Sequence, residues 1–402
     1  MTAFLGVIRS SRRKIFSRRA PFILCLLISS ALLSVTAAAQ HGGQRATYGR
    51  EDRPRPENDD RIEAEADRII KGAMKEKRIP GLVLGIVKGG QVVLRKGYGV
   101  KSLESDARPD ENTVFYIASL SKAITAFGVM LLVDEGKLRL DDRASKYLKG
   151  MPPSWERITL RQFMTHTSGI PQLDRKLPTF DAMLRSAAEM PMEFDAGTDQ
   201  TYNNFNFAVA GQVIEAVSGM KYLDYMKKRI FGPLQMNHTG YGVHGENNAA
   251  GYELTEGRPQ PVGEHRIFAG PFAIASGHLQ STMADLLKFE AAIRQGKLLS
   301  AAAYREMMTP VVLPPDKTKP SRGTPGWFAR EAGGVRIIHK NGAGQGFHSD
   351  FHFVPSRGDA VILLWNLTGK GSELRPAVDA LMEAVCGISQ PKKMASEPSG
   401  AY

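Results

Sequence analysis

The sequence contains very little cysteine, and this scarcity limits what can hold the fold together. Only Cys25 and Cys386 occur among the 402 residues, and Cys25 lies in an N-terminal stretch with the features of a removable leader. A chain that keeps a single thiol cannot form an internal disulfide bond. The composition is otherwise ordinary for a soluble globular protein, with 42% hydrophobic and 23% charged residues. We therefore expect the fold to depend on a hydrophobic core, which a chain of this length can bury.

The leader, residues 1–39, is predicted to be a secretory signal peptide. Six basic residues precede the apolar run PFILCLLISSALLSV, and Ala37 and Ala39 then form an A-x-A cleavage signal. We expect cleavage after Ala39 and export to the periplasm or the exterior, by either the general or the twin-arginine route. The alternative is a retained anchor, for which the run is rather short. Contact with a membrane would in that case come through the leader alone.

A strong excess of charge of one sign is also missing once the leader is set aside. The whole chain carries a formal charge of +12, but the leader supplies six basic and no acidic residues, which leaves 47 basic against 41 acidic residues. The remaining part of the chain has no dense basic stripe. Nucleic acid is therefore not an expected partner.

The chain beyond the leader shows a consistent order of elements. Residues 40–59 are polar and rich in glycine, proline and charge, which predicts a flexible linker. Residues 60–78 carry apolar side chains at helical spacing, and residues 82–99 hold two β-branched runs around a Gly-Gly pair, which is typical of a hairpin. Strand patterns return late in the chain, at residues 333–342, 347–354 and 359–367.

A helical region separates the two groups of strands. It begins with an almost entirely apolar helix at residues 123–138, which we expect Gly136 to terminate. Residues 137–310 then alternate short helices and loops. This order predicts an α/β (α+β) fold at residues 60–388, in which both ends of the chain build one sheet and residues 137–310 form an all-helical insert. A final helix precedes a polar tail at residues 389–402.

The stretch YIASLSKAIT contains the first candidate for catalysis. Ser119 and Lys122 are three residues apart, so they share one face of a helix. At a helix N-terminus, the outward backbone N–H groups stabilise a developing negative charge on Ser119, and a buried Lys122 can accept a proton. The alternative is a helix-capping serine beside a solvated lysine, although the apolar surroundings offer such a lysine few solvated positions.

Two further stretches carry candidate residues. In TYNNFN, Tyr202 and Asn204 lie just before a helix, where the asparagine can be a cap and the tyrosine a packed aromatic. A phenol near lysines can also be held partly as phenolate, because positive charge favours the charged form. In HKNGAGQGF, Lys340 is expected at the end of a strand, with glycines after it that let a ligand approach the backbone closely.

Together these three stretches resemble the serine β-lactamase and penicillin-binding-protein superfamily. Ser119-Leu120-Ser121-Lys122, Tyr202-Asn203-Asn204 and Lys340-Asn341-Gly342 follow the order of its boxes S-x-x-K, Y-x-N and K-T-G, of which the second is typical of the class C branch. The resemblance extends over about residues 60–388. It implies a β-lactamase/transpeptidase-like fold with an antiparallel sheet, and chemistry that needs no metal or other cofactor.

The resemblance also implies a role for each residue. Ser119 would be the acylated nucleophile, Lys122 would assist its deprotonation, and Tyr202 would be the shared acid and base. Asn204 would orient either the substrate amide or Lys122, and Lys340 would help to hold the phenolate. The substrate would further contact Asn341 and Gly342, and its oxyanion would bind the N–H groups of Ser119 and of Ala343, on the strand after the third box.

Some residues depart from this pattern or remain outside it. Asn341 replaces the threonine of K-T-G, whose hydroxyl helps to bind the substrate carboxylate in penicillin-recognising members. This change weakens the case for β-lactam substrates, although Asn341 can still donate a hydrogen bond. His348, Asp350 and His352 alternate along one strand and thus share a face, which makes a metal site conceivable but not expected.

The function predicted from the sequence is an exported serine hydrolase of the class C type, acting on a small-molecule or peptide substrate. An esterase or peptidase for ester, amide or D-peptide substrates is the first reading, and a β-lactamase or D-Ala-D-Ala carboxypeptidase is the second. A catalytically inactive protein that binds penicillin or wall fragments is the alternative of another class. The sequence decides neither the substrate nor the oligomeric state.

Overall fold

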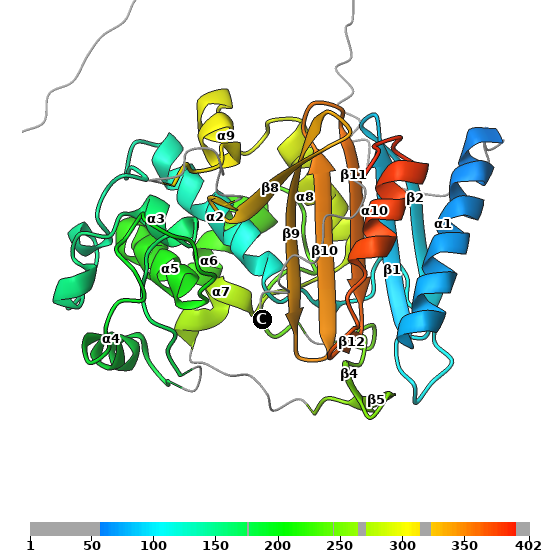
Figure 1. Cartoon of the computed structure of the whole chain (residues 1–402), viewed down its shortest axis with the longest axis horizontal. Helices are drawn as coiled ribbons and strands as arrows, with labels where there is room; N and C mark the ends of the chain where they lie inside the picture. Colours follow the sequence, from blue (N-terminus) through cyan, green and yellow to red (C-terminus); the bar gives the residue numbers. More distant parts are fainter. Residues whose placement is uncertain (1–56, 175–176, 244, 264–270, 314–322, 391–402) are drawn as a thin grey trace, which may run out of the picture. The chain divides into compact units, whose positions relative to one another are not determined.

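The core of the protein is one antiparallel sheet assembled from both ends of the chain. The computed structural model describes residues 57–174, 177–243, 245–263, 271–313 and 323–390. The sheet has seven strands in the order β2-β1-β11-β10-β9-β8-β7 (Figure 1). Their bounds are β1 Gly81–Lys88, β2 Gln91–Gly99, β7 Gly323–Thr324, β8 Trp327–Ala332, β9 Val335–Gly344, β10 Phe347–Val354 and β11 Asp359–Trp365. The predicted architecture is therefore confirmed, because β1 pairs directly with β11.

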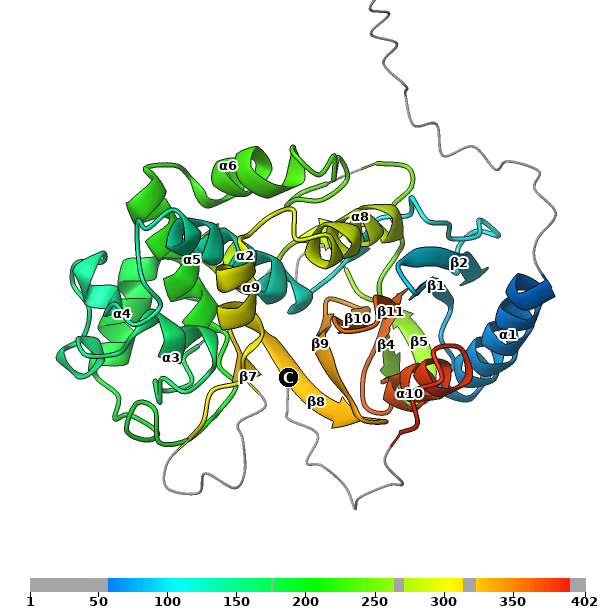
Figure 2. The same cartoon turned by 90° about the horizontal axis from the view of Figure 1, so that it is seen from above.

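Helices cover both faces of this sheet (Figure 2). On one face lie α1 (Glu57–Lys77) and α10 (Arg375–Ala384), and on the other lies α8 (Met283–Arg294). Successive residues of β1 contribute to two different cores, with Val83 and Val87 facing the α8 side and Leu84 and Ile86 the α1 side. This explains why β1 reads as a continuous hydrophobic run rather than an alternating one.

The hairpin and the first helix follow the sequence prediction closely. Gly89 and Gly90 have φ of +55° and +82°, the left-handed conformation that a tight two-residue hairpin turn requires. The first helix begins at Glu57, three residues before the predicted start, so the end of the predicted linker belongs to it. The acidic residues there suit the N-terminal end of a helix.

A helical region stands beside the sheet and is organised around α2. Its helices are α2 Leu120–Asp134, α3 Leu160–Met164, α4 Phe180–Ala188, α5 Phe205–Ser218, α6 Tyr222–Met226, α7 Ile274–Gly277 and α9 Ala301–Met308. All residues of α2 up to Leu132 are buried, because α5, α7 and α9 pack around it. Beyond its end, Gly136 has φ of +68°, as the prediction of a terminating glycine requires.

The prediction of an all-helical insert was wrong in two respects. Short strands occur within it: β4 (Tyr252–Thr255) pairs with β5 (Arg258–Pro261) and with β12 (Leu367–Thr368), and β6 (Gln280–Ser281) pairs with β3 (Phe115–Tyr116). In addition, α8 packs on the sheet, and its Met283 fills the space beside Gly85 of β1. These strands were missed because they are two to four residues long and largely polar, too short for a periodic signal.

Strand β8 was also missed in the sequence. Its residues WFAREA place an arginine and a glutamate next to each other near the strand end, which obscures the alternation. The described residues all belong to one compact unit. Within that described part, no helix combines the length and the hydrophobicity needed to cross a bilayer. The predicted leader, most of the predicted linker and residues 391–402 of the predicted tail lie outside the described residues.

Candidate active site

The chain enters α2 through a strained turn that presents Ser119. Ala118 has φ of +45°, which is uncommon for a residue with a side chain. Ser121 holds this turn in place: its Oγ donates to the Ala118 carbonyl at 2.6 Å and accepts from the Leu279 N–H at 3.1 Å. Ser121 was expected only as a variable position in the first box, and it instead fixes the backbone on which Ser119 sits.

The contacts of Ser119 decide between the two roles that the sequence left open. Ser119 is the N-cap residue directly before α2, but its side chain makes no capping hydrogen bond. Its Oγ instead accepts from Lys122 Nζ at 3.2 Å and from the Tyr202 hydroxyl at 2.7 Å. Lys122 is fully buried, so the reading as a solvated surface lysine is wrong.

Lys122 is held by acceptors from three separate segments. Besides Ser119, its Nζ donates to Asn204 Oδ1 at 2.8 Å and to the carbonyl of Ser276. Asn204 stands at the start of α5, yet its side chain does not cap that helix. The structure therefore brings Asn204 to Lys122, the second of the two contacts that the resemblance implied for it.

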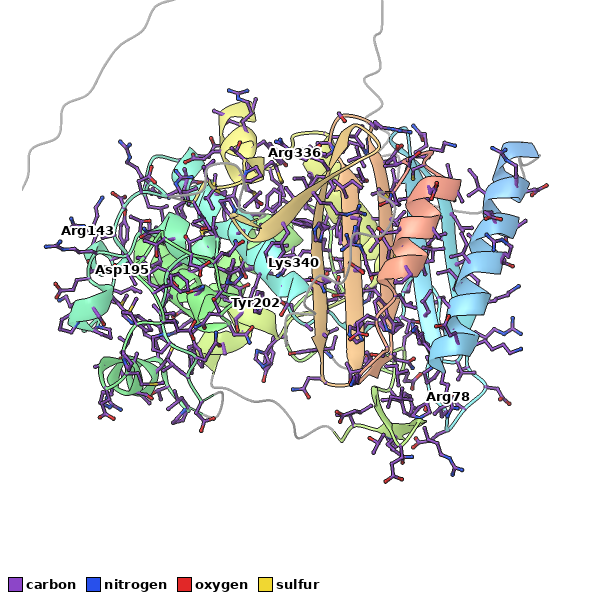
Figure 3. The ribbon with its side chains drawn as sticks, viewed as in Figure 1. Arg78, Arg143, Asp195, Tyr202, Arg336 and Lys340 are labelled. Carbon is purple, nitrogen blue, oxygen red and sulfur yellow. The ribbon has the colours of Figure 1, made fainter. Side chains whose placement is uncertain are left out.

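Tyr202 lies between two ammonium groups. Lys122 Nζ is 4.9 Å and Lys340 Nζ is 4.7 Å from the centre of its ring. Figure 3 shows Tyr202 and Lys340 close together, between the sheet and the helical region. Positive charge near a phenol favours its ionised form, so this arrangement suits a tyrosine that exchanges protons with Ser119.

Lys340 is buried without a hydrogen bond to its ammonium group. It lies in the middle of β9 rather than at a strand end, as was predicted, and only 1% of it is exposed. Its Nζ lies over the rings of Tyr202 and Phe328, and within the described residues it has no hydrogen-bond partner. Burial lowers the pKa of Lys340 to about 7, because the surroundings disfavour the charged form.

This burial predicts that Lys340→Met makes the protein more stable and less active. The folded state holds a poorly solvated ammonium below pH 7, whereas the unfolded chain solvates it. Between the folded pKa of about 7 and the ordinary 10.5, the unfolded chain binds more protons, so the stability of the wild type rises with pH. We expect the variant to melt about 2–5 °C higher at pH 6, with a smaller difference at pH 9. Calorimetry at both pH values checks this, and a variant less stable at pH 6 would contradict it.

The backbone of β9 beyond Lys340 lies directly against the serine. Strand β8 pairs with β9 only as far as His339, whereas β9 continues to Gly344, so no strand of the described residues covers this end of β9 on the β8 side. A Cβ atom added at Gly342 would collide with the carbonyl oxygen of Ile117 and would lie 2.7 Å from the Ser119 nitrogen. Only glycine allows this approach to the serine turn, whereas the approach of a ligand expected for this segment stays a prediction.

The other residues of the third box lie on the opposite face of the strand. Because side chains alternate along β9, Asn341 and Ala343 point away from the face that carries Lys340. Their partners across the sheet are Asp350 and His348. Ala343 belongs to the same strand as Lys340, whereas a following strand was expected. Its predicted role depends on its backbone N–H, which the direction of the side chain does not affect.

His166 is the residue at this site whose part the sequence reading missed. Its local sequence, THTSG, is typical of a short polar turn, and its φ of +60° agrees with a turn. Its ring, however, lies 4.4 Å from that of Tyr202, between centroids. The signal in the sequence was a histidine within a short polar turn, THTSG, and nothing local connects it with a tyrosine 36 residues later.

The conceivable metal site does not form. Nδ1 of His348 lies 2.6 Å from the Leu367 carbonyl and its ring stacks on Trp365, while His352 Nε2 is hydrogen-bonded to Asp350 Oδ1 at 2.7 Å. The nitrogens thus have different partners and do not converge on one point. The part of the chain that the structure describes contains no group of three or more His, Cys, Asp or Glu side chains placed to hold a metal ion.

Ser119 is in contact with the buried Lys122 and with Tyr202, beside an end of β9 that no described strand covers on the β8 side. This combination of side chains is typical of the serine β-lactamases and penicillin-binding proteins. Comparison with known proteins agrees with this class. The chain belongs to the Beta-lactamase family, whose model matches residues 66–385. The recognition made from the three boxes is thereby confirmed.

Two bacterial proteins are similar to this chain, and one of them is named as a putative penicillin-binding protein. The chain is 26% identical over 325 residues to "Protein flp" of Staphylococcus aureus strain N315, covering 76% of this chain and 63% of that protein. It is 29% identical over 253 residues to the "Putative penicillin-binding protein PbpX" of Bacillus subtilis strain 168, covering 60% and 61%. The chain thus spans less than two thirds of the length of these relatives.

A solved structure shares the fold. The octameric penicillin-binding protein homologue from Pyrococcus abyssi superposes with a TM-score of 0.70 at 25% identity, covering 81% of this chain and 78% of that one. This likeness confirms the mixed α/β fold with its antiparallel sheet.

Proposed function

We propose that this protein is a serine hydrolase that forms an acyl-enzyme on Ser119. One observation carries the proposal: the Ser119 Oγ lies 3.2 Å from Lys122 Nζ and 2.7 Å from the Tyr202 hydroxyl. A serine is a weak nucleophile unless a neighbouring group removes its proton, and here two such groups are in hydrogen-bonding reach.

In the proposed mechanism, Tyr202 reacts as the phenolate, which the positive charge of the neighbouring lysines favours. Ser119 Oγ attacks the carbonyl carbon of the substrate as the Ser119 proton passes to the Tyr202 phenolate oxygen, with Lys122 assisting. Tyr202 then gives the proton to the leaving alcohol or amine, and the acyl group stays on Ser119. In the second half, Tyr202 takes a proton from water, which attacks the acyl-enzyme. We assign the binding of the negative charge on the carbonyl oxygen to the backbone N–H groups of Ser119 and Ala343. The close approach of β9 at Gly342 to the Ser119 nitrogen supports this assignment.

The substrate class we propose is an ester, an amide or a D-peptide. We place an extended acyl chain along the end of β9 beyond its pairing with β8, in the way that peptides bind along sheet edges. A β-lactamase or D-Ala-D-Ala carboxypeptidase is the second candidate, and the relative named as a penicillin-binding protein supports it. Against it stands Asn341, which replaces threonine and projects from the opposite face of β9 to Lys340.

A protein that binds penicillin or wall fragments without catalysis is the alternative from another class. Such a protein needs a binding surface but not a serine in hydrogen-bond contact with both a lysine and a tyrosine. The contacts of Ser119 with Lys122 and Tyr202 therefore favour the enzyme.

A substrate panel tests the proposal. The purified protein is incubated with a short-chain nitrophenyl ester, a chromogenic cephalosporin and a D-Ala-D-Ala peptide, with Ser119→Ala as the control. We expect turnover of the ester that Ser119→Ala abolishes. Turnover of the cephalosporin or of the D-Ala-D-Ala peptide alone would move the assignment to the second candidate. If none of the three is turned over and a fluorophosphonate probe leaves Ser119 unlabelled, the protein is not a serine hydrolase.

We further propose that residues 1–39 are removed on export. The six basic residues, the apolar run and the A-x-A signal support this. The N-terminus of the protein recovered from the periplasm or the medium should be Gln40. Recovery of the protein with Met1 from the cell interior would contradict export.

A further inference from the structure

His166 makes three contacts with Tyr202 and the residues on either side of it. Its carbonyl oxygen accepts from the N–H of Thr201, the residue before Tyr202, at 3.0 Å. Its Nδ1 accepts from the N–H of Asn203, the residue after Tyr202, at 3.2 Å. Its ring lies against the Tyr202 ring at 4.4 Å, with 37° between the planes. One residue thus fixes the main chain on both sides of the tyrosine and supports its ring as well.

The hydrogen bonds of His166 require one protonation state. A backbone N–H can only donate, so Nδ1 must carry a lone pair and the ring proton must be on Nε2. The side-chain amide of Asn206 lies 3.1 Å from the same Nδ1, and the Asn206 carbonyl oxygen accepts in turn from Ser168 at 2.7 Å. Burial, with Lys340 and Lys122 nearby, keeps the pKa of His166 well below its usual value, in agreement with a neutral ring.

A neutral ring suits this place for an electrostatic reason. Tyr202 already lies between the ammonium groups of Lys122 and Lys340. His166 is buried, with only 4% of its surface exposed. A cationic imidazolium here would add a further positive charge close to the two lysines, with little water to solvate it. A neutral imidazole provides a flat apolar surface and an acceptor without that cost.

We propose that His166 is the positioning residue for Tyr202, which it holds against Ser119 and between the two lysines. The proposal rests on the proposed function, since it assigns His166 a part in the proton transfer through Tyr202. A histidine that merely fills the core would contribute to stability alone. A positioning residue also sets how readily the Tyr202 phenol ionises and how fast it exchanges protons with Ser119.

The test uses two variants that separate the features of His166. His166→Phe keeps a flat ring and removes the acceptor for the Asn203 N–H, whereas His166→Gln keeps an acceptor and removes the ring. His348→Phe is the matched control, because His348 is also buried and stacked on an aromatic ring, that of Trp365, on the other face of the sheet. The full-length mature protein is used throughout.

The first measurement is the ultraviolet titration of tyrosine at 295 nm, with Tyr202→Phe subtracted to isolate Tyr202. We expect His166→Phe to move this titration upward by about half a pH unit or more, since the phenol moves away from the positive charge that Lys122 holds beside it. The second measurement is ester hydrolysis over a pH range. We expect kcat to fall about 10- to 100-fold with KM changed less than about twofold, and the pH profile to shift.

The control makes the outcome decisive. His348→Phe should lower the melting temperature but keep the Tyr202 titration and the pH profile of the wild type. If His166→Phe does not fold, His166→Gln is judged by the same criteria. An unchanged Tyr202 titration and pH profile in the folded variant overturns the inference. A wild type without ester turnover but with a Tyr202 titration that depends on His166 refutes the proposed function alone.

Discussion

Replacing Tyr202 by phenylalanine should lower kcat/KM for a nitrophenyl ester about 10²- to 10⁴-fold and leave the fold intact. The change removes only the hydroxyl that donates to Ser119 Oγ at 2.7 Å, which is the group proposed to carry protons in both halves of the reaction. The ring keeps its packing against His166 and its place between the two lysines. The melting temperature should therefore stay within about 2 °C of the wild type.

Tyr222→Phe is the control for this prediction. Tyr222 also borders α2, and its hydroxyl lies 2.7 Å from Thr125 Oγ1, but it does not contact Ser119. We expect it to cost about 1 kcal/mol of stability and to leave kcat unchanged. Wild-type turnover by Tyr202→Phe would exclude the tyrosine from proton transfer and leave Lys122 as the base.

The second large effect is expected from Gly342→Ala. The added methyl group would collide with the Ile117 carbonyl oxygen, and it would lie 2.7 Å from both the Ser119 nitrogen and Ser349 Oγ. A hydrogen bond connects two of these groups, since Ser349 Oγ donates to the same Ile117 carbonyl at 2.7 Å. The strand and the serine turn must therefore separate, which widens the proposed oxyanion site. We expect at least about a 100-fold loss of kcat/KM, the usual effect of losing one oxyanion donor.

Gly72→Ala provides the matched comparison. Gly72 lies within α1, and nothing stands within 4 Å of a Cβ atom placed there. This variant should gain about 0.5–1 kcal/mol of stability, because alanine favours the helix, with no change in rate. A Gly342→Ala enzyme as active as Gly72→Ala would show that the close approach of β9 has no part in catalysis.

The candidate site was predictable to the extent that its residues occur in ordered short motifs. Ser119, Lys122, Tyr202 and Lys340 come from three boxes that lie 80 or more residues apart, and the structure brings them within a few ångströms of one another. The competing readings as caps were reasonable from local sequence alone. They fail because Ser119 and Asn204 stand at helix starts but direct their side chains to Lys122, which a local pattern does not reveal.

What could not be predicted depends on contacts between distant segments. His166 looks like a turn residue because its environment is created by Tyr202, Asn203 and Asn206, which the fold brings to it. Ser349 likewise belongs to no recognisable motif. Its contact with Ile117 exists only because the fold brings β10 next to the serine turn. In the fold, the hydrophobic pattern predicted the main sheet strands that come from both ends of the chain. The short strands of the insert were not, because pairing with other strands rather than intrinsic preference holds them in place.

The most direct test of the central claim is to identify the residue that becomes acylated. The wild type is mixed with a nitrophenyl ester, quenched in acid within one turnover, digested and mapped by mass spectrometry. The account predicts one acyl group, on the peptide that contains Ser119, that is absent in Ser119→Ala and accumulates more slowly in Tyr202→Phe. Turnover without any acylated peptide, or with the acyl group on another residue, would contradict it.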